Sequence, residues 1–310
     1  MSHESPAGHL TRAELEALAA RIPGNVRFGP SSWTYPGWTG LVYDPPYPKK
    51  DASASLLGAC ARWPLFRTVG IDSAFYAPPS APVLARYTKQ LPAGFECVSK
   101  VWQDITVRIW SRGQDKARAG RQNPHFLDAE LFTETVYRPY REAFAGHRGP
   151  FVFEFSPFGR HRDFTPDHFT DALDRFLAHL PGDARYAVEL RDAEFLTPAY
   201  FEVLRGHDAA HVISSWTQMP TVGEQLDLGV ASLAPFVVCR ALVRPGMFYE
   251  ESLGEFEPFD RIRQPDPDMR RDLARLVHAI QELGVPGFVI VGNRTEGCAP
   301  LTIAAVAAAL

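Results

Sequence analysis

Short apolar runs alternate with amphipathic segments along almost the whole chain. Eight runs have the length and composition of buried strands, and the segments between them repeat apolar residues at helical spacing. The predicted strands are Val26–Ser31, Arg67–Phe75, Phe95–Val101, Phe151–Phe155, Tyr186–Leu190, His211–Ser215, Phe236–Leu242 and Phe288–Val291. The predicted helices are Ser53–Trp63, Ala81–Leu91, Ala129–Phe144, Asp167–Leu180, Pro198–Gly206, Asp268–Leu283 and Pro300–Leu310, with the weakest pattern at Val222–Val230.

One further helix precedes the first strand. Thr11 and Glu14 have the spacing of a capping box, apolar residues follow at helical intervals, and Pro23 ends the segment. We therefore predict an N-terminal tail and helix over residues 1–24 and a single domain over residues 25–310.

The regular alternation of strand and helix predicts a parallel sheet with right-handed crossovers. Eight such units fit a closed barrel better than an open sheet, because closure removes the two sheet edges. The alternative, an open nucleotide-binding sheet, lacks its glycine-rich fingerprint, since Gly29-Pro-Ser-Ser-Trp33, at the end of the first strand, cannot form a phosphate-cradling loop that opens a helix. The expected fold is a (β/α)8 TIM-like barrel with an extra N-terminal helix.

Composition narrows the class of protein. The formal net charge of −4 argues against a free-standing basic nucleic-acid module. The four cysteines form no CxxC pair, so a zinc knuckle or redox motif is not expected. There is no signal-peptide pattern, and no apolar stretch approaches the roughly 20 residues of a membrane span. We expect a cytoplasmic protein that does not bind a membrane; the sequence does not indicate its oligomeric state.

Charged residues gather where predicted strands end, which is the face that carries the chemistry of α/β barrels. Glu189 and Arg191 lie two apart, so both point to the same side of their strand. Burial against apolar helices would cost several kcal/mol per ion, so we place both inside the barrel. There they can meet Asp72, Lys100, Glu154 and Arg240.

This ring of charge predicts a site where cations hold an anionic group and a carboxylate moves a proton. The candidate catalytic residues are Glu189, Asp72, Lys100 and Glu154. The candidate substrate-binding residues are Arg191, Arg240, Asn293, Tyr76, Trp33 and Trp216. No cofactor is predicted; a divalent metal stays open because carboxylates are available, although strand-end histidines are nearly absent. The alternative is a structural ion network that plugs the barrel end.

Two long segments leave the same face of the predicted barrel. Residues 33–50 are rich in aromatic residues, proline and glycine, and residues 103–128 carry five basic residues. Each is a candidate lid over the site, and the alternative is an irregular surface loop.

The run Gly29-Pro-Ser-Ser-Trp33-x-Tyr35-x-Gly37-Trp38 resembles the opening of the YecE-like proteins, a barrel family named as a domain of unknown function. The resemblance continues through Val69-x-Ile71-Asp72-Ser73-x-Phe75-Tyr76-x-Pro78 and Val188-Glu189-Leu190-Arg191, and it covers nearly the whole chain after the first helix. It implies a (β/α)8-like barrel with polar strand ends and no assigned reaction.

This chain is a divergent member by that comparison. Gly70 and Asp72 stand where the family commonly has Glu and Asn, Glu154 replaces a common Gln, and Asp192 replaces a His. The residues Lys100, Glu189, Arg191, Arg240 and Asn293 fit the family pattern.

Three functions remain as hypotheses. The first is an enzyme that acts on a phosphorylated or otherwise anionic small molecule by acid–base chemistry: hydrolysis, isomerisation or elimination. The second is a metal-dependent nuclease or phosphodiesterase, in which the arginines of residues 103–128 contact nucleic-acid phosphates; the acidic net charge disfavours it. The third is a non-catalytic binding protein.

Overall fold

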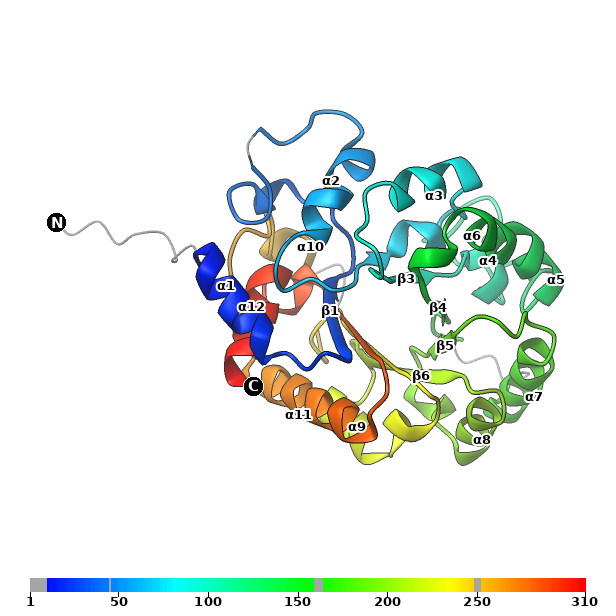
Figure 1. The fold of residues 1–310 in the computed structure, drawn as a ribbon. Helices are drawn as coiled ribbons and strands as arrows, with labels where there is room; N and C mark the ends of the chain where they lie inside the picture. The colour runs from blue at the N-terminus through cyan, green and yellow to red at the C-terminus, as the bar shows by residue number, and fades with distance from the viewer. Residues whose placement is uncertain (1–9, 45, 159–163, 248–251) are drawn as a thin grey trace.

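The computed structural model describes residues 10–44, 46–158, 164–247 and 252–310. Eight parallel strands form one sheet in the order β1-β8-β7-β6-β5-β4-β3-β2, and helices surround it (Figure 1). The strands are β1 (Val26–Pro30), β2 (Gly70–Ile71), β3 (Cys97–Lys100), β4 (Arg148–Glu154), β5 (Tyr186–Glu189), β6 (Ala210–Ser215), β7 (Val237–Ala241) and β8 (Gly287–Val291). The predicted barrel and its strands are confirmed, most of them to within two residues at each end.

The barrel is nearly closed between its first two strands. The backbone N–H groups of Arg67 and Thr68 both donate to the carbonyl of Phe28, just before β2 begins. Gly29 makes this approach feasible, because a Cβ there would lie 1.8 Å from the Thr68 carbonyl oxygen.

The strand predicted over Arg67–Phe75 was wrong in extent. Only Gly70–Ile71 pairs with β3, and Asp72–Phe75 forms the 3-10 turn η2. The reason is a tertiary contact: the backbone turns after Ile71 instead of continuing as a strand, and Asp72 Oδ2 then lies 2.6 Å from Arg240 Nη2 across the barrel end.

The longer helices follow the predicted pattern closely. Those before β5 are α1 (Arg12–Arg21), α2 (Ala52–Ala61), α3 (Ala81–Thr88), α4 (Gln103–Thr106), α5 (Ala129–Phe132), α6 (Arg138–Ala143) and α7 (Pro166–Leu177). Those after β5 are α8 (Pro198–Gly206), α9 (Val222–Asp227), α10 (Ser252–Glu255), α11 (Pro267–Leu283) and α12 (Ala299–Ala309). The π-helical segment η3 (Thr133–Tyr137) joins α5 to α6 without a break. Further 3-10 turns are η1 (Pro36–Trp38), η4 (Ala145–His147), η5 (Ala193–Phe195), η6 (Val230–Ser232) and η7 (Asn293–Thr295).

The N-terminal helix α1 begins at the predicted capping box. Thr11 N donates to the Glu14 carboxylate at 2.7 Å, and Glu14 N donates back to the Thr11 hydroxyl. The helix packs against α12, so the two ends of the described chain lie side by side (Figure 1). Residues 1–9 of the predicted tail lie outside the described residues.

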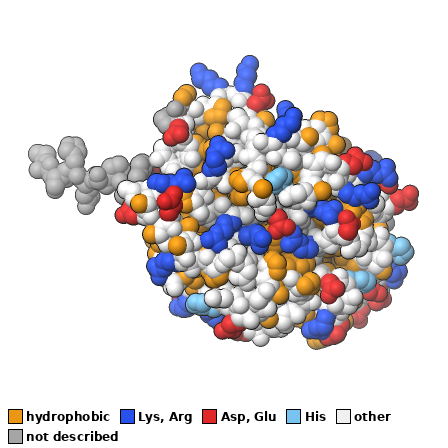
Figure 2. Space-filling view, viewed as in Figure 1, with side chains coloured by type: hydrophobic (Ala, Val, Ile, Leu, Met, Phe, Trp, Pro, Cys, Tyr) orange, Lys and Arg blue, Asp and Glu red, His pale blue; other side chains and the backbone are white. Residues whose placement is uncertain are grey.

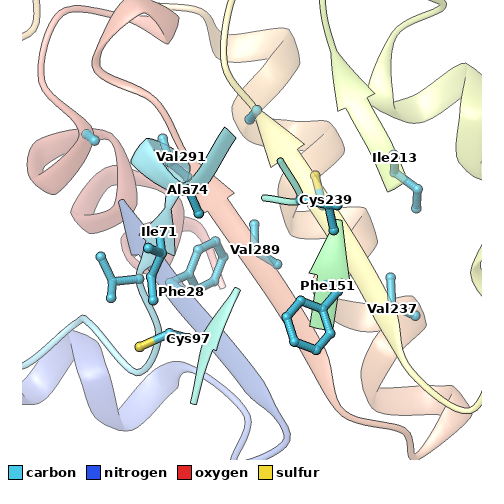
Figure 3. Close-up of a cluster of buried hydrophobic side chains, with 14 of the residues drawn as sticks. Phe28, Ile71, Ala74, Cys97, Phe151, Ile213, Val237, Cys239, Val289 and Val291 are labelled. Atoms are coloured by element: carbon cyan, nitrogen blue, oxygen red, sulfur yellow. The ribbon is translucent and has the colours of Figure 1, made fainter. Parts of the chain in front are cut away.

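Two apolar layers build the core. Alternate strand residues such as Phe151 and Val289 face the surrounding helices, and Figure 3 shows part of this outer cluster. The other alternate residues, among them Val152, Ala187 and Val238, form a separate cluster inside the barrel. The barrel interior is therefore filled by side chains at this level.

In the described part of the chain, no helix is both long enough and apolar enough to cross a membrane.

Candidate functional site

The polar site lies directly above the apolar interior of the barrel, at the carboxyl ends of the strands. Residues two positions after an interior apolar residue point the same way. Lys100 thus follows Val98, Glu154 follows Val152, and Arg240 follows Val238, while Glu189 follows the interior Ala187. The strand pattern itself brings these charges together.

Six of the predicted residues form one ion network. Glu154 and Glu189 are register partners on β4 and β5, so two carboxylates stand side by side. The Oε2 atom of Glu154 lies 2.8 Å from Lys100 Nζ and 2.7 Å from Arg191 Nη2. Arg191 Nη2 also lies 2.6 Å from Glu189 Oε1.

Arg240, on β7, contacts all three carboxylates of the network. Its Nη1 pairs with Glu189 and, at 3.2 Å, with Glu154, while its Nη2 lies 2.6 Å from Asp72 Oδ2. The network thus contains three cationic and three carboxylate side chains. With all six ionised its charges cancel, which is what allows such a group to be buried.

The three carboxylates differ in accessibility. The Glu189 side chain is 0% exposed and that of Glu154 is nearly buried, whereas the Asp72 side chain is 29% exposed and lines the cavity. Asp72 is therefore the carboxylate of the three that a bound molecule can reach most readily.

The pKa values of Asp72 and Glu154 are shifted in opposite directions. Burial raises the pKa of Asp72 above its usual value, although Arg240 and Lys100 favour its ionised form. Burial would also raise the pKa of Glu154, but the three surrounding cations more than offset it and hold the pKa well below the usual range. Glu154 therefore favours its ionised form more strongly than Asp72 does.

Two of the cations are held against aromatic rings. Lys100 Nζ lies 3.7 Å from the ring centroid of Phe75, and the Arg191 guanidinium lies 3.5 Å from that of Trp216. Cation–π contacts of this kind fix the positions of the charged groups. Arg191 Nε and Nη1 and Arg240 Nε are buried donors without a hydrogen-bond partner among the described residues.

A cavity of about 970 Å³ opens above the network. It is lined by Asp72, Lys100, Glu154, Arg191, Trp216, Arg240, Asn293 and the 72%-exposed Tyr76. Its size is at the upper end of the ~300–1,000 Å³ typical of small-molecule sites. Nine of the ten predicted site residues line it or belong to the network below it.

Trp33 does not belong to this site. It is 3% exposed, does not line the cavity, donates from Nε1 to the Ser53 carbonyl at 2.9 Å and packs edge-on against Tyr87. The aromatic residue after β1 anchors its loop in the core.

Asn293 lines the cavity but also has a structural contact. Its Oδ1 accepts a hydrogen bond from Ala299 N, the first residue of α12, at 2.8 Å. This bond fixes the amide orientation, and Nδ2 is a buried donor with no hydrogen-bond partner among the described residues.

The segment predicted as a loop over residues 103–128 is partly ordered by its own contacts. It begins with the helix α4, and Arg118 pairs with Asp104 and Asp115 at 2.8 and 2.7 Å while stacking on Trp110. Arg118 therefore stabilises the conformation of this segment. Trp110 and Arg108 line the cavity; the sequence interpretation counted Arg108 only as a basic loop residue and missed Trp110.

The segment over residues 33–50 is anchored rather than loose where it is described. Trp38 is fully buried, and the Tyr43 hydroxyl donates to the Trp33 carbonyl at 2.5 Å. At Gly37, a Cβ would lie 1.8 Å from the Pro258 carbonyl oxygen, so this segment packs closely on the one that follows β7. Whether either segment closes over a ligand stays a prediction.

Metal ligands are not grouped in the described residues: no set of three His, Cys, Asp or Glu side chains is placed to hold an ion. The site carboxylates instead face lysine and arginine. On the face of the molecule in Figure 2, basic and acidic side chains are interspersed.

The sequence profile of a family described as "Protein of unknown function DUF72" matches residues 27–310. Among curated proteins, none matches the sequence. A DUF72 family protein from Thermotoga maritima superposes with a TM-score of 0.61 at 18% identity, over 91% of this chain and 97% of its own. A second, from Enterococcus faecalis, gives a TM-score of 0.59 at 18% identity, over 91% and 95%. At these identities the likeness shows a common fold.

Proposed function

Because the chain belongs to the DUF72 family of proteins of unknown function, we propose its function from the cavity itself: it is an enzyme that binds a phosphorylated or otherwise anionic small molecule and moves a proton by acid–base chemistry. The observation that carries the proposal is one accessible carboxylate, Asp72, which pairs with Arg240 at the floor of a cavity that Lys100 and Arg191 also line.

Lys100, Arg191 and Arg240 supply the anion site in this proposal. All three line the cavity, and each is already oriented by a buried glutamate. A phosphate or carboxylate group suits such prepositioned donors, because charge-assisted hydrogen bonds to oxygen anions are strong and directional.

Asp72 supplies the proton transfer. Its raised pKa brings its protonation closer to neutral pH than that of an ordinary aspartate, which favours general acid or base catalysis. Glu154 and Glu189 are assigned a positioning role, because both are buried and held by cations. Of the four catalytic candidates predicted from the sequence, the proposal therefore keeps Asp72 as the proton-transfer group and assigns Lys100 to anion binding.

The metal-dependent nuclease remains the alternative. A divalent ion at Glu154 or Glu189 would have to displace lysine and arginine groups from the same oxygens. In that alternative, nucleic-acid phosphates would contact the exposed basic residues of the 103–128 segment, which are Arg112, Lys116 and Arg121.

The test is turnover of a panel of phosphomonoesters and small carboxylates, with products followed by mass spectrometry. Asp72→Asn should slow turnover at least about a hundredfold and still bind the substrate, since general acid–base groups typically contribute 10²–10⁴-fold. Asp268→Asn, at an exposed carboxylate that is not part of the cavity lining, is the matched control. Equal turnover by Asp72→Asn and wild type would refute the role of Asp72; no turnover of any panel member would favour the non-catalytic alternative.

A further inference from the structure

The cavity has two chemically different parts. Its floor is the charged network of Lys100, Arg191, Arg240 and Asp72. Its walls are rich in aromatic side chains contributed by five separate segments of the chain. These side chains are Tyr35, Phe75, Tyr76, Trp110, Trp216 and Phe259.

Trp216 joins the two parts. The Arg191 guanidinium lies 3.5 Å from the centroid of its ring, and Arg191 is itself fixed by Glu154 and Glu189 at 2.7 and 2.6 Å. The indole is half-buried and contributes to the cavity lining. A wall residue is thereby held directly beside the proposed anion site.

An aromatic ring that is held next to cationic side chains fits a ligand that carries both a planar ring and an anionic group. Planar rings gain from stacking on tryptophan and tyrosine, in addition to the apolar area they bury. A volume of about 970 Å³ is also larger than a bare phosphate or a small sugar phosphate needs.

We infer that the ligand carries a planar aromatic or heteroaromatic group together with its anionic group, as a nucleoside monophosphate does, and that Trp216 is the surface on which the ring stacks. The inference rests on the proposed function for the anionic end of the ligand. The ring end is independent of the reaction that Asp72 performs.

Three probes separate the two parts: adenosine 5′-monophosphate, ribose 5-phosphate without the base, and adenosine without the phosphate. Calorimetry at low ionic strength should give binding of the monophosphate at least about tenfold tighter than either fragment. Equal affinity for the monophosphate and ribose 5-phosphate would overturn the ring inference and leave the anion site. Equal affinity for the monophosphate and adenosine would overturn the proposed anion site and leave the ring site. Absence of binding by all three would overturn both.

Substitutions at Trp216 locate the ring site. Trp216→Leu also removes the ring that packs on Arg191, so it should weaken both probes, but it should weaken the monophosphate about tenfold more than it weakens ribose 5-phosphate. Trp216→Phe, which keeps a ring, should recover most of the affinity for the monophosphate. Trp102→Leu replaces a half-buried tryptophan outside the cavity lining and is the matched control. Melting curves of each variant check the fold. If Trp216→Leu, folded, binds the monophosphate like wild type, Trp216 is not the stacking surface.

Discussion

Replacing Glu189 by glutamine tests whether the buried network holds the barrel end together. Glu189 is 0% exposed, and its carboxylate meets Arg191 Nη2 at 2.6 Å and Arg240 Nη1. Glutamine keeps the size but removes the charge, so two buried guanidinium groups lose a shared counter-ion. Breaking a buried ion pair by removing one partner costs about 3–5 kcal/mol.

This free energy translates into a measurable change of melting temperature. In domains of 150–250 residues, each kcal/mol shifts the melting temperature by roughly 2–4 °C, and this longer chain belongs at the low end. We therefore expect Glu189→Gln to melt about 6–10 °C below wild type at pH 7, measured by differential scanning calorimetry. Glu202→Gln, at an exposed glutamate that pairs with Arg205, is the control and should change stability by less than about 1 kcal/mol.

The result that would refute the reasoning is an unchanged or higher melting temperature for Glu189→Gln. It would mean that the network is a costly remnant, as the non-catalytic hypothesis expects. A double variant with Arg191→Met adds a check: if the two side chains act as a pair, its destabilisation should be clearly less than the sum of the single variants.

Three further predictions follow from particular contacts. Burial lowers the pKa of His211 to about 4, so as the pH falls the unfolded chain takes up a proton there before the folded chain does. The free energy of unfolding should therefore fall by up to ~3 kcal/mol between pH 6.5 and 4. Urea titrations should find this pH dependence in the wild type and not in His211→Asn. Gly29→Ala should destabilise the folded protein by about 3 kcal/mol or more, because the added Cβ would lie 1.8 Å from a backbone carbonyl oxygen. Gly24→Ala, at a glycine with open space around it, is the control and should be nearly neutral. Similar urea midpoints for the two variants would contradict the close approach described between β1 and the segment before β2. Carbon-13 spectra should show Asp72 titrating above, and Glu154 well below, the usual carboxylate range, and the reverse order would remove the basis for assigning proton transfer to Asp72.

The fold and the membership of the site follow largely from local sequence. Each strand alternates its side chains between the helices and the interior, so an apolar residue followed two positions later by a charge marks the carboxyl end of the barrel. Glu189 and Arg191 could be placed inside the barrel because the other side would have buried both against apolar helices.

The remaining features depend on contacts between distant segments. No local pattern distinguishes Asp72 from Glu154, because their different exposure arises where β2, β4 and β7 meet. For the same reason Trp33 was assigned to the site although it packs on α2 and α3, through Ser53 and Tyr87.

The most direct test of the account is calorimetric titration of ribose 5-phosphate into the protein at low ionic strength. The account predicts saturable binding that weakens with added salt, is lost in Lys100→Met and Arg191→Met, and persists in Arg175→Met, an exposed arginine outside the cavity lining. Absence of saturable binding to the wild-type protein, or equal binding by all four proteins, would contradict the claim that the charged end of this barrel is an anion site.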